Sequence, residues 1–307
     1  MPDNGKKKSL IVIVGPTAIG KTALAIELAQ HFSTEIISAD SRQFFKEMNI
    51  GTAKPSPAEL AAAPHHFINS HSINTFFSTG DFENEVLKLT DKLFINHDTI
   101  IMVGGSGLYI DAVCNGLDVL PETNMEIREK LNNLLITDGI ESIQQQLKEA
   151  DPEYYAKVDQ FNPQRMIRGL EFYLSTGERF SSYLTHSKKE RPFNIIKIGL
   201  NTDRALLYER INHRVDVMMQ AGLLDEVKGL EPWKELNALK TVGYAELFNY
   251  IEGNCTLIEA IDKIKQNTRR FAKRQLTWFR RDDKIYWFEP DQLTQITNHL
   301  ESNLTSF

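Results

Sequence analysis

The sequence predicts an α/β protein, a doubly wound parallel sheet with a helical insertion. Two observations support this prediction. Short apolar runs rich in β-branched residues alternate with stretches of helical periodicity, and one long central stretch contains helical signals only. Strands separated by helices imply right-handed crossovers, which place helices on both faces of a parallel sheet.

Five segments are expected to form strands. The first, Leu10–Val14, is a continuous apolar run, which is typical of a strand buried on both faces. A helix is expected shortly after it, over Thr22–His31. The remaining strands are expected at Glu35–Ser38, Thr99–Val103, Phe193–Leu200 and Lys284–Phe288.

The strand signals stop between residues 120 and 191. Asn162 and Pro163 are typical of a helix start, with a capping side chain followed by proline at the first helical position. Helices are expected over Met125–Leu135, Ile140–Leu147 and Gln164–Ser175. We therefore expect residues 1–120 and 191–307 to form the α/β core, and residues 121–190 to form a helical insertion.

The composition is that of a soluble globular protein. Of the 307 residues, 41% are hydrophobic and 25% are charged, and no apolar run approaches the roughly 20 residues that a membrane-spanning helix needs. Two cysteines, Cys114 and Cys255, are too few for a disulfide framework, so we expect reduced thiols in a cytoplasmic protein without membrane contact. The net charge of −6 argues against nucleic-acid binding unless positive charge is concentrated locally.

The most specific motif is GPTAIGKT, which fits the phosphate-binding pattern G-x-x-x-x-G-K-[ST]. It stands after a buried strand and at the start of a helix, where backbone N–H groups and the helix dipole favour phosphate. Lys21 adds a positive charge, and the Thr22 hydroxyl is placed to bind Mg²⁺. The residues expected around the phosphates are Gly15, Pro16, Thr17, Ala18, Ile19, Gly20, Lys21 and Thr22. Kinases, NTPases and diphosphate-releasing transferases all use such a loop.

Two polar residues follow the next two expected strands. Asp40 follows the second strand, and Ser106 follows the third within VGGSGLY. Because ligand groups of doubly wound sheets lie just past the carboxyl ends of strands, both should face the phosphate loop. Asp40 could hold Mg²⁺, accept a proton, bind a cation or cap a helix. We favour a base, because the Mg²⁺-binding aspartate of P-loop proteins usually lies on another strand. Ser106 could offer its hydroxyl to a ligand, cap the next helix, or do both.

Seven segments together carry a resemblance to a known family. They are GPTAIGKT from Gly15, SADSRQ from Ser38, IGTAKP from Ile50, VGGSGLY from Val103, NPQRMIRGLE from Asn162, TVGY from Thr241 and AKRQLTWFR from Ala272. In this order they resemble the bacterial tRNA dimethylallyltransferases, also called tRNA isopentenyltransferases. The resemblance implies transfer of the dimethylallyl group of dimethylallyl diphosphate to the 6-amino group of the adenine 3′-adjacent to the anticodon, in a tRNA anticodon loop. The phosphate loop would hold the substrate's diphosphate, with Mg²⁺ as cofactor, and we expect a monomer.

The resemblance implies four catalytic residues. Asp40 matches the general base that takes a proton from the adenine amine, and Ser106 matches a hydroxyl, usually threonine in this family, beside the bridging oxygen of the leaving group. Lys21 matches a diphosphate contact, and Thr22 a metal contact. Arg214 matches an arginine that reaches the diphosphate; the alternative is a solvated charge on a helix.

Contacts with tRNA are implied for further residues. Residues 40–43 match the segment that handles the target nucleotide, which we expect to be flipped into a channel. Residues 164–168 match a tRNA-contacting helix, in which Arg165 and Arg168 share one face. The implied contacts are Asp40, Ser41, Arg42, Gln43, Ser106, Arg128, Gln164, Arg165, Met166, Ile167 and Arg168.

A basic segment near the C-terminus, residues 268–287, indicates RNA binding independently of the family. Its cations are interleaved with aromatic residues, which can track a phosphate backbone and stack on unpaired bases. Lys273 and Arg274 are the expected tRNA contacts in it. The alternative is an amphipathic helix with a solvated basic face and aromatic side chains in the core.

The chain departs from the family pattern at Phe45, Asn49 and Ser106, which concerns rate and positioning rather than the class of reaction. Three other functions stay open on the residues alone. A small-molecule P-loop kinase would give the basic segment no purpose. A nucleotide-gated RNA-binding switch would form no product, and a prenyltransferase for free adenine nucleotides would need no RNA-binding face.

Overall fold

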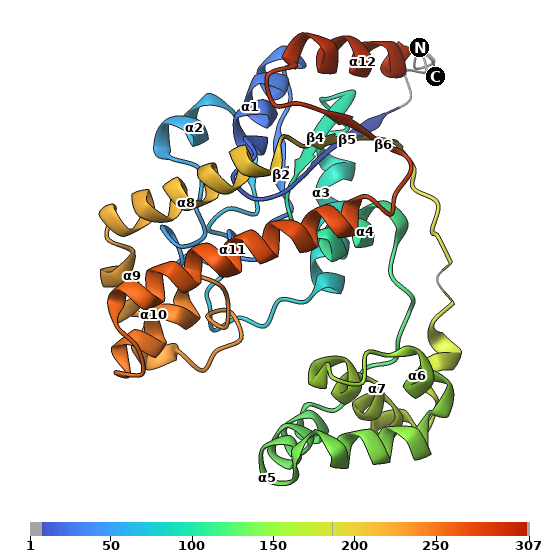
Figure 1. Ribbon diagram of the computed structural model, residues 1–307. Coiled ribbons are helices and arrows are strands. Elements are labelled where there is room, and N and C mark those ends of the chain that lie inside the picture. The colour runs from blue at the N-terminus through green and yellow to red at the C-terminus, as the bar shows by residue number, and fades with distance from the viewer. Residues whose placement is uncertain (1–7, 186, 306–307) are drawn as a thin grey trace. The chain divides into compact units, whose positions relative to one another are not determined.

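The computed structural model describes residues 8–185 and 187–305 (Figure 1). The chain divides into two compact units, with the boundaries between Asn115 and Gly116 and between Lys189 and Glu190. The larger unit contains the sheet. The smaller unit consists of helices and their connections in the residues described. No helix among these residues combines the length and the apolar character that crossing a membrane requires.

The sheet has six parallel strands in the order β3-β2-β4-β1-β5-β6. The doubly wound α/β fold predicted from the sequence is therefore confirmed. The strands are β1 Ser9–Val14, β2 Ile36–Ser38, β3 His65–His66, β4 Thr99–Val103, β5 Asn194–Leu200 and β6 Ile285–Phe288. Strand β3 was not expected from the sequence, because two residues are too short to show a period.

The side chains of β1 alternate between two hydrophobic cores, one on each face of the sheet. Ile11 and Ile13 pack with α1, α8 and α12, whereas Leu10, Val12 and Val14 pack with α3 and α4. Successive strand residues point to opposite faces, so a continuous apolar run is what a strand covered on both sides requires. These helices are α1 Lys21–His31, α3 Thr79–Leu93, α4 Gly107–Asn115, α8 Arg204–Gln220 and α12 Leu293–Thr305.

A third core joins helices of the C-terminal half to the loop after β2. Phe44 and Met48 of that loop pack with Tyr244 and Leu223, so side chains of the helices hold the loop in place. A capping box of Thr256 and Glu259 starts the longest helix of this group. The helices are α9 Leu223–Gly229, α10 Tyr244–Ile251 and α11 Leu257–Phe279, with the short η2 Glu231–Trp233; α2 Pro57–Ala62 lies between β2 and β3 in the chain.

The smaller unit has its own core of leucine, isoleucine and methionine side chains. Its elements are α5 Met125–Ala150, α6 Pro152–Lys157, α7 Pro163–Thr176 and η1 Phe180–Tyr183. The two helices expected before residue 150 are the two arms of α5, which is interrupted at Gly139 by a φ of 79°. The expected cap of α7 is present, since the Asn162 side chain accepts the Arg165 N–H at 3.2 Å.

Candidate active site

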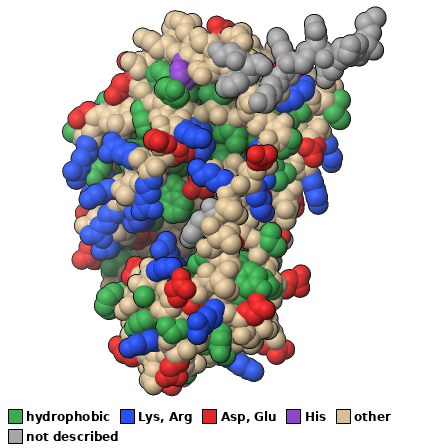
Figure 2. Space-filling model, turned by 90° about the vertical axis from the view of Figure 1, so that its right-hand side faces the viewer, with side chains coloured by type: hydrophobic (Ala, Val, Ile, Leu, Met, Phe, Trp, Pro, Cys, Tyr) green, Lys and Arg blue, Asp and Glu red, His purple; other side chains and the backbone are tan. Residues whose placement is uncertain are grey.

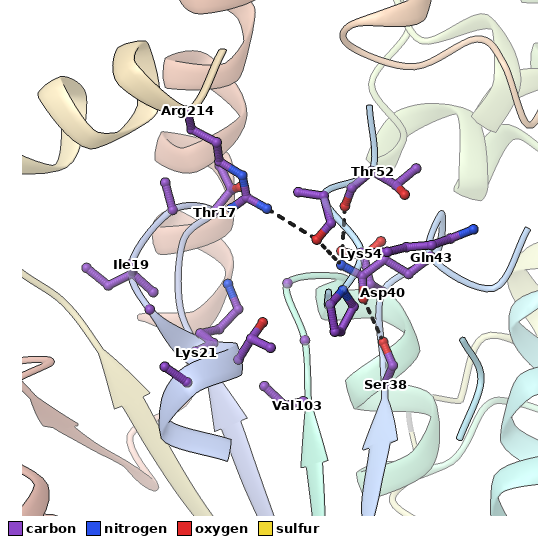
Figure 3. A pocket seen from close by; sticks show the side chains of 18 of the residues that line it. Thr17, Ile19, Lys21, Ser38, Asp40, Gln43, Thr52, Lys54, Val103 and Arg214 are labelled. Atoms are coloured by element: carbon purple, nitrogen blue, oxygen red, sulfur yellow. Dashed lines mark hydrogen bonds between the residues drawn. The ribbon is translucent and has the colours of Figure 1, made fainter. Parts of the chain in front are cut away.

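Two adjoining cavities lie at the carboxyl edge of the sheet, with volumes of about 460 and 230 Å³. The first is lined by the phosphate loop and by the ends of β2 and β4, and the second reaches between α8 and α11. Figure 3 shows Lys21, Asp40 and Arg214 around the same space. The residues that line both cavities are Thr17, Asp40, Thr52, Ala53, Arg214 and Phe271.

The phosphate loop has the conformation that its glycines permit. Gly20 has a φ of 103° at the start of α1, and a Cβ atom at Gly15 would lie 2.7 Å from the Leu200 carbonyl oxygen. Residues 17–22 line the first cavity. Gly15 and Pro16, by contrast, are buried and do not line this cavity. The Ile19 side chain is part of the hydrophobic core.

Lys21 lies within the first cavity with its charge only partly compensated. Its Nζ atom donates to the Pro16 carbonyl oxygen at 2.8 Å. Burial, and then the nearby Arg214 guanidinium, lower the pKa of Lys21 to about 7, against the opposing effect of Asp40. A bound anion would compensate these positive groups, as the phosphate motif predicts.

Asp40 follows β2 and lines both cavities. Its Oδ1 atom accepts the Arg42 N–H at 3.0 Å, within a turn. The alternative that Asp40 caps a following helix is wrong, because the next described helix, α2, starts only at Pro57. The negative charge of Asp40 raises the pKa values of Lys21 and Arg214, so it stabilises the charged form of both side chains.

Ser106 holds the loops after β2 and β4 together. Its Oγ atom accepts the Ser41 N–H at 2.9 Å, and it lines the second cavity. Its carbonyl oxygen accepts N–H groups of the first turn of α4, so the residue also stands at the helix start. The close approach of the loops needs glycine, because a Cβ atom at Gly104 would lie 2.2 Å from the Ala39 carbonyl oxygen.

Arg214 lies in the site and is not a solvated helix charge. It projects from α8 to line both cavities, and burial lowers its pKa while Asp40 opposes that effect. Ser41 and Arg42 line the second cavity, and Gln43 lines the first. These four residues, with Asp40, are thus brought to one place from two elements, α8 and the turn after β2.

Gln275 belongs to the site, although it was not among the residues expected there. It is buried on α11, where its Oε1 atom accepts the Thr17 N–H at 2.9 Å and its Nε2 atom donates to the Gly105 carbonyl oxygen at 3.0 Å. A Cβ atom at Gly105 would lie 2.1 Å from Nε2. The side chain therefore joins the phosphate loop to the loop after β4. Its place in AKRQLTWFR was the signal that could have found it.

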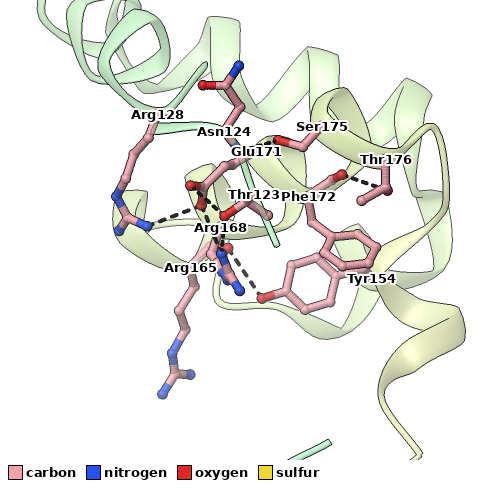
Figure 4. A network of polar contacts seen from close by, with 10 residues as sticks. All are labelled: Thr123, Asn124, Arg128, Tyr154, Arg165, Arg168, Glu171, Phe172, Ser175 and Thr176. Atoms are coloured by element: carbon pink, nitrogen blue, oxygen red, sulfur yellow. Dashed lines mark hydrogen bonds and ion pairs between the residues drawn. The ribbon is translucent and has the colours of Figure 1, made fainter. Parts of the chain in front are cut away.

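The implied tRNA contacts of the smaller unit fall into two groups (Figure 4). Arg128 and Arg168 converge on Glu171, whose side chain is 1% exposed, at 3.1 and 3.2 Å. Arg165 points away from this network, and it forms no ion pair among the residues described. Gln164 beside it is exposed.

The expectation that Met166 and Ile167 contact tRNA is wrong for their side chains. Both are fully buried in the core of the smaller unit. The helix period of 3.6 residues turns these two positions inward when Arg165 faces solvent. In the first turn of α7, Gln164 and Arg165 are therefore the exposed side chains.

Basic side chains gather on one face of the molecule (Figure 2). On α11, Lys273 and Arg274 are exposed, and Lys273 lines a separate cavity of about 340 Å³ with Arg204 and Arg280. The aromatic residues of the basic segment differ in burial, so some fit the expected contact with RNA bases and others fit the alternative of packing in the core. Phe279 is a core residue, whereas Phe271 is 38% exposed and lines both site cavities.

The chain is similar to known proteins over nearly its whole length. The family model described as IPP transferase matches residues 43–282. The chain is 55% identical over 298 residues to a tRNA dimethylallyltransferase of Christiangramia forsetii, covering 97% of this chain and 99% of the relative. It is 51% identical over 306 residues to a tRNA dimethylallyltransferase of Flavobacterium johnsoniae, with 97% and 99% coverage.

Solved structures give the same result. The full-length tRNA isopentenylpyrophosphate transferase of Bacillus halodurans has a TM-score of 0.73 and 35% identity, with 98% of each chain covered. A eukaryotic dimethylallyltransferase acting on tRNA has a TM-score of 0.78 and 26% identity, with 96% of this chain and 80% of that chain covered. The family that the seven segments indicated is confirmed, and the chain belongs to the IPP transferase family.

Proposed function

We propose that this chain transfers the dimethylallyl group of dimethylallyl diphosphate to the 6-amino group of the adenine 3′-adjacent to the anticodon of tRNA. The observation that carries the proposal is the position of Asp40, a carboxylate that lines the phosphate-loop cavity and the cavity adjoining it. The group that would bind the diphosphate, the phosphate loop, and the proposed base, Asp40, then line the same cavity. The relatives are named tRNA dimethylallyltransferases, which supports dimethylallyl transfer to tRNA.

The proposed step is a direct displacement. The adenine nitrogen forms a bond to C1 of the dimethylallyl group while the bond between C1 and the diphosphate oxygen breaks. Asp40 takes the proton of the amine, and diphosphate leaves with the electron pair. Lys21, Arg214 and the amides of the phosphate loop stabilise the charge that grows on the leaving group.

Mg²⁺ fits the proposed site through Thr22. Its hydroxyl forms no hydrogen bond among residues 8–185 and 187–305, and the residue lines the phosphate-loop cavity. Mg²⁺ prefers few protein ligands together with phosphate oxygens and water, so one hydroxyl beside a diphosphate is a suitable donor set. Bound there, the ion would neutralise charge on the diphosphate.

A transfer assay with labelled dimethylallyl diphosphate and Mg²⁺ tests the proposal. We expect label in unmodified tRNA and none in AMP. Label in AMP would identify a prenyltransferase for free nucleotides instead. Phosphate transfer from ATP without prenyl transfer would favour a kinase, and tight ATP or GTP binding with no product would favour an RNA-binding switch.

Replacing Arg165 with alanine is expected to weaken tRNA binding and to reduce the slope of log K against log salt by about 1. The reason is that Arg165 is exposed and, unlike Arg168, is not held by Glu171. Binding titrations at several salt concentrations measure the slope.

Arg179→Ala is the matched control for this prediction. Arg179 is an exposed arginine of the same unit, beyond the opposite end of α7. The two variants lose the same charge, so the slope should change for Arg165→Ala alone. Equal slopes in both variants and the unchanged protein would remove Arg165 as a phosphate contact.

A further inference from the structure

The Glu226 carboxylate on α9 accepts hydrogen bonds from four donors. Its Oε2 atom accepts the N–H groups of Asn49 and Ile50 at 3.0 and 2.8 Å. Its Oε1 atom accepts the Gly51 N–H at 3.1 Å and the Tyr244 hydroxyl at 2.6 Å. Four donors match the number of lone-pair sites that a carboxylate offers. The side chain therefore fixes three successive residues of a loop that is distant from it in sequence.

That loop, residues 49–54, forms part of the candidate active site. Thr52 and Ala53 line both cavities. Their carbonyl oxygens each accept a hydrogen bond from Gln43 Nε2 at 3.2 Å, and Arg214 Nη2 lies 3.5 Å from the Ala53 oxygen. Figure 3 shows Gln43 and Arg214 directed toward this loop. Two site residues thus take their positions from the loop backbone.

The backbone of the loop is held in a conformation that it would not adopt by itself. Ala53 has a φ of 48°, which is unfavourable for a residue with a Cβ atom. A Cβ atom at Gly51 would lie 2.5 Å from the Tyr244 ring, so the loop is pressed against that ring. Burial and Glu226 raise the pKa of Tyr244, which keeps its hydroxyl protonated as a donor. Among the residues described, Glu226 and Tyr244 line neither cavity.

We infer that Glu226, with Tyr244, is a positioning residue for the transfer reaction, which acts through the loop of residues 49–54 on Arg214 and Gln43. The inference rests on the proposed function. Its physical basis is that loss of the carboxylate releases three N–H groups at once, and the carbonyl oxygens that follow them shift. A displacement of about 1 Å in a catalytic constellation lowers rates by up to about 10²-fold.

Glu226→Gln tests the inference, because glutamine keeps the size but turns one acceptor atom into a donor that faces the loop amides. We expect kcat/KM to fall about 10- to 100-fold, with a higher Kd for dimethylallyl diphosphate. Tyr244→Phe removes one donor and leaves the three amide contacts, so a smaller loss is expected. Asp225→Asn, an adjacent residue whose side chain is 85% exposed, should have no effect.

A double-mutant cycle separates positioning from a general loss of stability. If Glu226 acts through Arg214, Glu226→Gln should lower activity much less in an Arg214→Ala background than in the unchanged protein. Additive losses, or full activity of Glu226→Gln, would overturn the inference. Should Glu226→Gln fail to fold, the same cycle with Tyr244→Phe decides. Because the unchanged protein must transfer label to tRNA in the same assay, failure of the proposed function is recognised separately.

Discussion

Replacing Asp40 with asparagine is expected to lower the turnover of dimethylallyl transfer by about 10²- to 10⁴-fold, without change in the affinity for tRNA. Asparagine keeps an oxygen that can accept the Arg42 N–H, which Asp40 does at 3.0 Å, so the turn after β2 should persist. What is lost is the capacity to take the proton of the adenine amine. Single-turnover transfer with saturating substrates, together with a tRNA binding titration, measures both quantities.

Saturating dimethylallyl diphosphate is essential in this experiment. Asp40 also raises the pKa of Lys21 and itself carries a negative charge beside the diphosphate site, so the substitution also changes the affinity for the diphosphate. At saturation this binding effect disappears and the loss of the base remains. Turnover within a few fold of the unchanged protein under these conditions would exclude Asp40 as the general base.

The parts of the site that the sequence predicted are those with a local pattern. The strand is indicated by its continuous apolar run. The glycines and the lysine that follow it within a few residues are recognised by the spacing of the phosphate-binding motif. Asp40 and Ser106 could be placed because the carboxyl ends of parallel strands meet at one edge. The helical insertion followed equally from the absence of strand signals.

The parts that could not be predicted depend on contacts between distant segments. Gln275 binds a loop amide 258 positions away, and Glu226 binds Gly51 across 175 positions. Neither contact leaves a period or a spacing in the sequence. The error at Met166 and Ile167 has a different cause. The family resemblance covers the whole segment of residues 164–168, whereas the helical period of the same residues separates a buried face from an exposed one.

Replacing Lys21 with methionine is expected to lower kcat/KM for dimethylallyl diphosphate by about 10²- to 10³-fold. Methionine fills similar space but leaves the departing diphosphate without the ammonium charge. In the unchanged protein, affinity for dimethylallyl diphosphate should also depend on pH. Burial lowers the pKa of Lys21 to about 7, and a bound anion raises it. Above pH 7, binding of dimethylallyl diphosphate is therefore accompanied by uptake of a proton by Lys21. The affinity is at its maximum below pH 7 and falls as the pH rises, by at most about tenfold per pH unit.

Calorimetric titration with dimethylallyl diphosphate in the absence of tRNA tests this dependence. The range of pH 7 to 9 is suitable because phosphate groups with a pKa of about 6 are already ionised there. Lys21→Arg keeps its charge throughout the range and should show a flat profile, since arginine stays protonated. Lys21→Met should bind weakly at every pH. An unchanged slope in both variants would show that another group takes up the proton, and unchanged affinity of Lys21→Met would show that the Lys21 ammonium does not bind the diphosphate.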